Sequence, residues 1–233
     1  MTVLPRRSVA AGAGLLVGAM ALGARAQQQI ASIAVSPKIT AKPFTFNPEK
    51  VKGLSADLLR SHHGLYAERV KRLNAIGDEL AKLDFGNAPA EKVAELKREE
   101  HSSYNSSVLH ELYFDGIGET PSRPSGLLEQ AMGRDFGSID RWKAEFVATS
   151  RTLTEGEGWV ILAHSPRDKR LFNHWAGDDS MAPAGAAPLL AVDMYKHAYE
   201  VDYGDDVAKY IDAFTRLIKW TNVERLYREA MRV

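Results

Sequence analysis

The stretch that decides the fold is PLLAVDMYKHAYEVDY, residues 188–203. Its first part, PLLAVD, has the length and composition of a buried strand. Asp193 and His197 follow at the end of that strand, four residues apart among apolar and aromatic neighbours. Such a pair is most often a buried acid and imidazole that hydrogen-bond to each other. It becomes a metal site only if other parts of the chain supply further ligands.

The N-terminal half predicts a helical hairpin. Ser55 is a candidate N-cap, and apolar residues follow it at spacings of three, four and seven as far as Leu80. The segment FGNAP, residues 85–89, ends this pattern, and a second helix is predicted from about Ala90 to Phe114. Two long antiparallel helices joined by a short turn therefore form one layer of the predicted fold.

The C-terminal half predicts a small antiparallel sheet. GWVILAHS (158–165) and KRLFNHW (169–175) are separated by a turn and form a predicted hairpin, to which PLLAVD adds a third strand. Predicted helices at about 124–134 and 138–153, and one long amphipathic helix from Asp206 to Arg232, cover the sheet. The predicted class is α+β, an N-terminal helical hairpin plus a C-terminal domain with a three-stranded antiparallel sheet.

The first 26 residues are typical of an export signal. Arg6 and Arg7 precede an apolar run that ends in a small-residue site at Ala26, and the paired arginines favour the twin-arginine route over a Sec signal. We therefore expect a periplasmic or secreted protein.

Three further segments follow the signal. Residues 27–53 hold three prolines and no helical period, so we expect a leader and an extended arm. We assign residues 54–118 to the helical hairpin domain and 119–233 to the C-terminal domain.

Composition excludes several kinds of site and partner. Thirty basic residues balance thirty acidic ones, so no long-range field attracts nucleic acid or an anionic membrane, and we expect neither partner once the signal is removed. The absence of cysteine excludes disulfides, thiolate metal sites and cysteine nucleophiles. The sequence also lacks a phosphate-binding loop, a Gly-x-Ser-x-Gly elbow and a His-Glu-x-x-His helix.

Histidines on the two predicted hairpin helices provide the missing ligands. The first helix carries the adjacent pair His62 and His63, and the second carries His110 among apolar and aromatic residues. With Asp193 and His197 they offer three imidazoles and one carboxylate from different elements. This set suits a redox-active first-row metal with an open position. A carboxylate-bridged di-metal bundle would need Glu-x-x-His on two helices, which the sequence lacks.

The order of motifs resembles that of the iron/manganese superoxide dismutases. Five stretches carry the resemblance between Pro43 and Tyr227: LSADLLRSHHGLYAERVKRLN, SSVLHELYF, GEGWVIL, PLLAVDMYKHAYEVDY and KYIDAFTRLIKW. The resemblance implies an enzyme that disproportionates superoxide to oxygen and hydrogen peroxide at one iron or manganese ion per chain. It implies four metal ligands, with His63 as the alternative to the first: His62, His110, Asp193 and His197.

The sequence departs from the family's D-x-W-E-H-A-Y-Y pattern next to the last ligands. Tyr195 replaces the tryptophan, Lys196 the glutamate and Glu200 the second tyrosine. In the family, that glutamate bonds a metal-binding histidine of the partner subunit, and a lysine cannot accept such a hydrogen bond. Lys196 and Glu200 can pair with each other or with a partner chain, so we expect a homodimer with an altered interface.

Other family positions are also changed. The gateway tyrosine would correspond to Arg69, with Tyr66 about one turn earlier as a substitute. The glutamine that bonds the metal-bound solvent has no obvious counterpart, and three residues are candidates: His174, Asp178 and Asp179. Three aromatic residues would belong to the shell that keeps the site dry: Trp159, Trp175 and Tyr203. The leading hypothesis is an exported superoxide dismutase, and the alternative is a non-catalytic metal-binding or interaction protein with the same fold.

Overall fold

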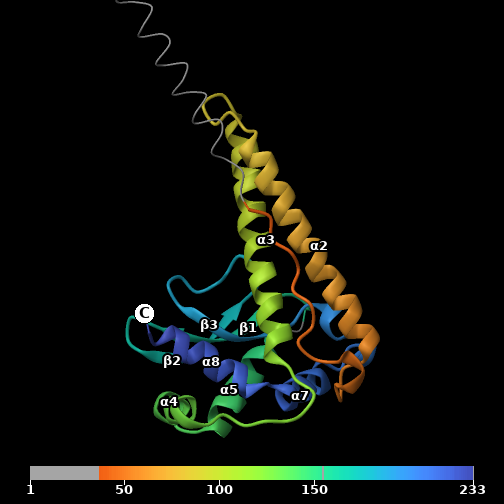
Figure 1. Ribbon diagram of the computed structural model, residues 1–233. Coiled ribbons are helices and arrows are strands. Elements are labelled where there is room, and N and C mark those ends of the chain that lie inside the picture. The colour runs from red at the N-terminus through yellow and green to blue at the C-terminus, as the bar shows by residue number, and fades with distance from the viewer. Residues whose placement is uncertain (1–36, 154, 233) are drawn as a thin grey trace, which may run out of the picture. The chain divides into compact units, whose positions relative to one another are not determined.

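The structure, a computed structural model, describes residues 37–153 and 155–232 (Figure 1). The export signal predicted at residues 1–26 lies outside the described residues. None of the helices in the described ranges has the length and apolar character that a membrane crossing requires.

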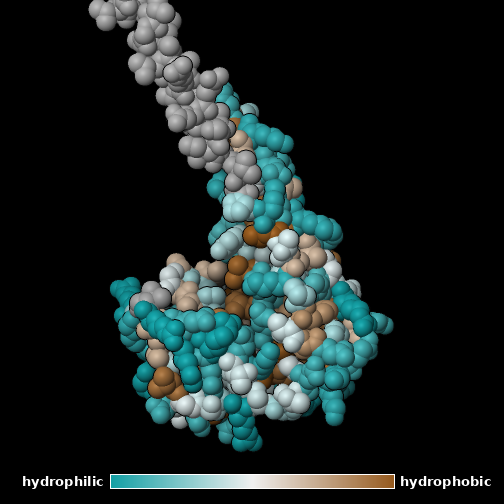
Figure 2. Space-filling model, viewed as in Figure 1, coloured by the Kyte–Doolittle hydropathy of each residue, from teal (hydrophilic) through white to brown (hydrophobic). Residues whose placement is uncertain are grey.

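The predicted helical hairpin is confirmed. Helix α2 (Ala56–Ala81) and helix α3 (Ala90–Gly116) lie side by side (Figure 1). The Ser55 side chain accepts a hydrogen bond from the Leu58 backbone N–H at 3.1 Å, so it is the N-cap of α2. In the face seen in Figure 2, the outer turns of the hairpin are mostly hydrophilic, and hydrophobic residues show nearer the sheet.

An extended arm precedes the hairpin and is fastened along α2. Asn74 accepts from the Ile39 backbone N–H at 3.0 Å and donates to the Ile39 carbonyl at 2.7 Å. The arm ends in the short 3-10 helix η1 (Pro48–Lys50), which Asn47 caps.

The three predicted strands form one antiparallel sheet in the order β2-β1-β3. They are β1 (Trp159–Ser165), β2 (Arg170–Ala176) and β3 (Ala187–Asp193). All residues of the central strand β1 are buried except the last, as expected for a strand covered on both faces. The register sets Trp159 opposite Asp193, which brings the start of β1 to the end of β3.

Helices cover this sheet, so the predicted α+β class is confirmed. Helix α4 (Gly126–Phe136) contacts β2, and helix α5 (Ile139–Ser150) contacts β1 and β2. Helices α3 and α8 (Trp220–Ala230) contact β3, while α7 (Val207–Leu217) packs on α5. Within the described ranges, the residues from Lys38 onward form one compact unit by their contacts.

The prediction of one long helix from Asp206 to Arg232 is wrong, because the chain breaks between α7 and α8. The broken turn pairs instead with the segment that follows α3. The Leu217 carbonyl accepts from the Gly118 N–H at 2.9 Å, and the Lys219 N–H donates to the Gly116 carbonyl at 2.8 Å. These bonds replace the helical ones, so tertiary pairing overrides the local helical pattern.

Candidate metal centre

Four elements bring the predicted ligands together. Helix α2 carries His62, α3 carries His110, β3 ends at Asp193, and the short helix η2 (Lys196–Ala198) carries His197. One nitrogen or carboxylate oxygen from each lies within 4.8 Å of those of the others. The first three are buried, and the side chain of His197 is 32% exposed. The site is therefore closed on the hairpin side and open at His197.

Three imidazole nitrogens surround one carboxylate oxygen. The Nε2 atoms of His62, His197 and His110 lie 2.9, 3.2 and 3.6 Å from Asp193 Oδ2, respectively. This convergence of one oxygen and three nitrogens, drawn from four elements, is the donor set that a first-row metal prefers.

Asp193 is held at both its side chain and its main chain. Asp193 Oδ1 accepts from the Tyr195 backbone N–H at 2.8 Å, which fixes the carboxylate plane and leaves Oδ2 toward the histidines. The Tyr210 hydroxyl donates to the Asp193 carbonyl at 2.6 Å. The Met194 N–H donates to the Gly158 carbonyl at 2.9 Å, so β3 stays paired to β1 up to the ligand. Sequence patterns gave no sign of the role of Tyr210, because only the fold brings α7 to the end of β3.

The hydrogen bonding of His110 fixes its tautomer. Its Nδ1 lies 2.7 Å from the Ser106 carbonyl oxygen, which can only accept, so Nδ1 carries the proton. The Nε2 atom then carries a lone pair, and it is buried without a hydrogen-bond partner. Burial lowers the pKa of His110 to about 3, with the neighbouring His62 adding to the effect. An unpaired buried lone pair is costly without a ligand, and a metal ion would satisfy it.

The pKa values of His62 and Asp193 are shifted in the directions that metal binding requires. Burial lowers the pKa of His62 despite its hydrogen bond to Asp193. Burial alone would raise the pKa of Asp193, but hydrogen bonds from His197 and His62 outweigh it and hold that pKa below its usual range. Metal binding requires neutral imidazoles and an ionised carboxylate, so the residues present fit such an ion.

The side chains of His62 and His63 lie in different surroundings. The His63 Nε2 atom lies 2.7 Å from the Lys42 carbonyl of the extended arm, and its ring contacts Phe44 with centroids 4.5 Å apart. Of the two candidates for the first ligand, only His62 faces the cluster.

Known proteins are similar to this chain in sequence. The family description "Iron/manganese superoxide dismutases, C-terminal domain" matches residues 124–226. "Superoxide dismutase [Fe]" of Cupriavidus metallidurans is 47% identical over 192 residues, which are 82% of this chain and 97% of that protein. The chain belongs to the iron/manganese superoxide dismutases.

More distant members of the family cover similar lengths. "Superoxide dismutase [Mn]" of Mycobacterium lepraemurium is 30% identical over 72% of this chain and 80% of its own length. "Superoxide dismutase [Fe]" of Pyrobaculum aerophilum is 29% identical over 81% of this chain and 90% of its own. Relatives named for either metal thus match most of the chain.

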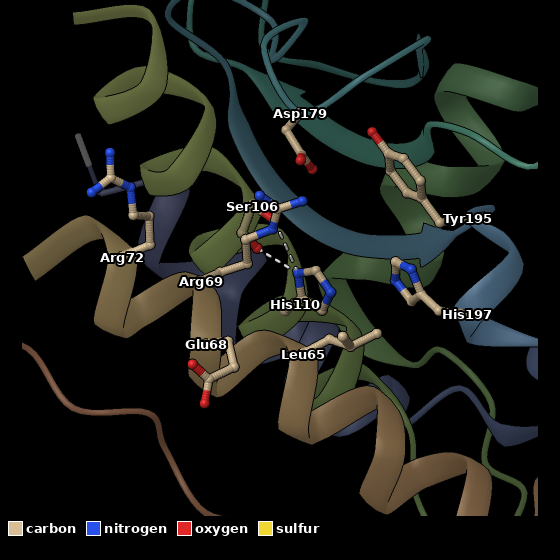
Figure 3. Close-up of a pocket in the computed structure, with 9 residues that line it drawn as sticks. All are labelled: Leu65, Glu68, Arg69, Arg72, Ser106, His110, Asp179, Tyr195 and His197. Atoms are coloured by element: carbon tan, nitrogen blue, oxygen red, sulfur yellow. Dashed lines mark hydrogen bonds between the residues drawn. The ribbon is translucent and has the colours of Figure 1, made fainter. Parts of the chain in front are cut away.

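A cavity of about 440 Å³ leads to the open side of the ligand cluster (Figure 3). His110 and His197 form part of its wall, and Tyr195 stacks on His197 with ring centroids 5.5 Å apart. Side chains of α2 form the opposite wall, including Arg69. This cavity is the approach that a small molecule would use to reach the ligands.

The two gateway candidates lie in different places. Tyr66 is 1% exposed, and its hydroxyl accepts from the Lys42 N–H and donates to Glu111, each at 3.0 Å. Burial raises the pKa of Tyr66 to about 12, helped by the charge of Glu111. Arg69 lines the cavity, whereas Tyr66 is not among its lining residues.

The three candidates for the solvent-bonding position differ in their partners and in whether they line the cavity. His174 lies 2.5 Å from the Met181 carbonyl, and the Asp178 carboxylate accepts from the Ser180 N–H at 2.7 Å. Asp179 alone of the three lines the cavity. It accepts a hydrogen bond from the Trp159 indole N–H at 2.9 Å, and burial raises its pKa.

Of the aromatic residues predicted to keep the site dry, Trp159 contacts the ligands. Its ring meets His110 edge-on with centroids 5.0 Å apart. Trp175 is 46% exposed, and the Tyr203 hydroxyl donates to the Gly53 carbonyl instead. Tyr195, which the sequence pattern marked only as a departure, takes a place in the shell beside His197.

Lys196 and Glu200 are both exposed, beside the ligand His197. Lys196 and Glu200 are four residues apart, a spacing at which opposite charges can pair. The ion pairs of the described residues do not include a pair between them. The Lys196 stem lies over Gly156, where a Cβ atom would collide with it. Neither residue lines the cavity that leads to the candidate ligands.

Proposed function

We propose that this chain disproportionates superoxide to oxygen and hydrogen peroxide at a mononuclear iron or manganese site, with one ion per chain. The observation that carries the proposal is the convergence of three imidazoles and one carboxylate within 4.8 Å. The relatives, named as iron or manganese superoxide dismutases, support the same activity. Bound iron or manganese would supply the one-electron exchange, since either ion accepts these ligands.

The chain's own residues prepare this chemistry. His62, His110, Asp193 and His197 would hold the ion, and the Ser106 carbonyl keeps the His110 Nε2 lone pair directed at it. The Tyr195 N–H orients the carboxylate, so little reorganisation is needed when the ion binds. The buried hairpin side excludes water, and the cavity admits a small anion.

We assign the gateway role to Arg69 rather than Tyr66. A guanidinium at the mouth attracts an anion such as superoxide, whereas the Tyr66 hydroxyl is occupied by the arm and Glu111. Changing Arg69 to Glu should lower kcat/KM about tenfold at low ionic strength, less at high ionic strength, and leave metal content unchanged. The exposed Arg98 on α3, changed to Glu, is the matched control with the same change of charge. Equal losses in both variants would refute the assignment.

The metal assignment is tested with adjacent histidines. The purified chain should contain about one iron or manganese ion and remove superoxide in a flux assay. His62→Ala should lose the ion and the activity, while His63→Ala should keep both. Equal metal content in the two variants would contradict the ligand set.

The alternative is a non-catalytic relative that binds metal without turning over superoxide. It is favoured by Lys196 and Glu200, which replace the family's residues beside His197. A chain with one ion and no superoxide removal would support this alternative and reject the enzyme.

The same surface is the proposed dimer contact. His197 is 32% exposed, and Lys196 and Glu200 lie at the surface beside it, so a second copy would close the open side of the site. An ion pair between Lys196 of one copy and Glu200 of the other would replace the family's usual contact across the dimer. Light scattering should give the mass of a dimer, and Lys196→Glu should shift it toward the monomer.

We also propose export of the mature chain to the periplasm or medium. The paired Arg6 and Arg7, the apolar run and the site at Ala26 support the twin-arginine route. Export should stop when both arginines are changed to lysine, and the exported protein should begin at Gln27. An unprocessed chain retained in the cytoplasm would refute this proposal.

A further inference from the structure

We infer that Asp202 and Tyr203 are positioning residues, which fasten the segment that carries His197 to the start of helix α2. Both lie in the short helix α6 (Glu200–Tyr203), which begins two residues after η2 ends. The residues of α6 neither line the cavity nor belong to the candidate ligand set. The inference rests on the proposed function, because it concerns how His197 is held while the site binds an ion.

His197 is the candidate ligand that its surroundings hold least. It lies on η2, a helix of three residues, and forms part of the cavity wall, whereas the other three ligands are buried (Figure 3). Among the described residues, its ring has one hydrogen bond, to Asp193 Oδ2 at 3.2 Å. The same carboxylate is a candidate metal ligand, so this bond alone cannot keep the ring in place when an ion binds. The position of His197 therefore depends on how η2 is anchored.

The chain around η2 is anchored first on the side of β3. The Tyr195 backbone N–H and the Tyr210 hydroxyl hold Asp193, at 2.8 and 2.6 Å. Tyr199, the residue after η2, stacks its ring on that of Tyr210, with centroids 5.2 Å apart. These contacts fix the chain as far as Tyr199, and α6 begins at the next residue.

Two hydrogen bonds join α6 to the residues that lead into α2. The Asp202 carboxylate accepts from the Ser55 backbone N–H at 2.6 Å, and the Tyr203 hydroxyl donates to the Gly53 carbonyl. The bonded residues are 147 and 150 positions apart in the chain. Gly53 has a φ of +103°, and a Cβ atom there would lie 3.3 Å from Ala213 of α7. The start of α2 therefore packs closely against both α6 and α7.

The charge of Asp202 suits its place at the start of α2. Backbone N–H groups at a helix N-terminus lack helical acceptors, and the helix dipole favours an anion there. The Ser55 side chain accepts from the Leu58 N–H, while the Ser55 N–H itself donates to Asp202. A charged acceptor makes a stronger hydrogen bond than a neutral one. The contact between Ser55 and Asp202 is therefore a specific attachment of α6, although it lies at the surface.

This attachment lies close to two of the ligands. His62 follows Ser55 by about two turns of α2, and His197 precedes Asp202 by about five residues. Helix α2 contacts η2 directly, and the rings of His62 and His197 lie with their centroids 4.9 Å apart. Holding α6 on the start of α2 therefore holds His197 opposite His62. Ligands that already have this separation lose less freedom when an ion binds.

The test compares two exposed acids of one segment in the metal-loaded protein. Asp202→Ala removes the acceptor of the Ser55 N–H, and Asp205→Ala is the control with the same change of charge. We expect an excess of chelator to withdraw the ion about fivefold faster from Asp202→Ala than from the unmodified protein, because a charged hydrogen bond that holds α6 is lost. Asp205→Ala should release the ion at the unmodified rate. Asp202→Asn keeps an oxygen that can accept from Ser55, so it should recover most of the difference.

A spectrum distinguishes positioning from general stability. The electron paramagnetic resonance spectrum of the iron-loaded protein depends on how the ligands are arranged around the ferric ion. Asp202→Ala should change the rhombicity of this spectrum, while Asp202→Asn and Asp205→Ala should keep it. Unfolding of the metal-free proteins in urea measures the purely structural part of the effect. If Asp202→Ala does not fold, Tyr203→Phe removes the bond to Gly53 instead and should change the spectrum and the release rate in the same direction.

Three results would overturn the inference. They are an unchanged spectrum in the folded variant, equal release rates in Asp202→Ala and Asp205→Ala, and faster release that the loss of stability of the metal-free protein explains completely. In each case an unmodified protein that holds one ion and removes superoxide would leave the proposed function intact. An unmodified protein that takes up no iron or manganese would reject both.

Discussion

Replacing His164 in strand β1 should stabilise the protein, increasingly so as the pH falls. His164 is 1% exposed, and neither ring nitrogen has a hydrogen-bond partner. The ring packs edge-on against Tyr227 of α8, with centroids 5.5 Å apart. Changing His164 to Leu removes two unpaired buried polar atoms, each of which costs about 1–3 kcal/mol, although part of that gain is lost in repacking.

The pH dependence follows from the charged form of this imidazole. Burial lowers the pKa of His164, and the nearby cations Lys169 and Arg134 lower it further. The acids Asp135 and Asp168 oppose this shift but do not outweigh it. The folded state therefore binds the proton less readily than the unfolded state, whose value is about 6.5. Above that value His164 is neutral in both states and does not change the free energy of unfolding with pH. As the pH falls below it, protonation of the unfolded state lowers the free energy of unfolding, by up to about 1.4 kcal/mol at one pH unit lower.

Equilibrium unfolding in urea measures the difference. The advantage of His164→Leu over the unmodified protein should grow by up to about 1.4 kcal/mol between about pH 8 and about pH 5.5. The exposed His101 on α3, changed to Leu, is the control for replacing a histidine by leucine at the surface. Titration of the metal ligands affects all three proteins alike and cancels in the comparison. An advantage of His164→Leu that is the same at both pH values would refute the reasoning.

Three further changes test the fold around the site. Gly158→Ala should lower the free energy of unfolding by about 1–3 kcal/mol or more in denaturant titrations, because φ is +101° there and a Cβ would overlap the Ala176 carbonyl. Tyr66→Phe should lower thermal stability by about 1–2 kcal/mol through the lost bond to Glu111, while metal analysis finds the ion retained. Ser55→Ala should cost about 1 kcal/mol in the same unfolding assay, since it removes the cap of α2. Loss of metal in Tyr66→Phe, or no loss of stability in either of the other two, would contradict these expectations.

Local patterns were sufficient for most of the fold. The period of apolar residues located the hairpin, because each helix buries one stripe, and short apolar runs located the three strands. The break between α7 and α8 could not be found in this way. It is set by backbone bonds to the Gly116–Gly118 segment, which lies about a hundred residues earlier in the chain.

The four side chains that meet in the candidate site could be named from the sequence, with His63 left as an alternative to His62, but their surroundings could not. Tyr66 and Arg69 lie four and seven residues after His62, about 40° and 20° to opposite sides of it around the helix. Counting residues cannot decide which of them meets the cavity. The same holds for Asp178 and Asp179, since only the packing of the loop against Trp159 determines which acid is buried.

The site draws its ligands from distant parts of the chain, and His62 and Asp193 are separated by 131 positions. A ribosome that has completed only the hairpin has made two of the four residues of the candidate site, His62 and His110, and has not yet made Asp193 or His197. The complete candidate site can therefore form only after β3 and η2 have been synthesised and have joined the hairpin. An ion bound by all four residues would link α2, the first long helix, to β3, the last strand. Its binding would therefore require the folded chain and would stabilise it.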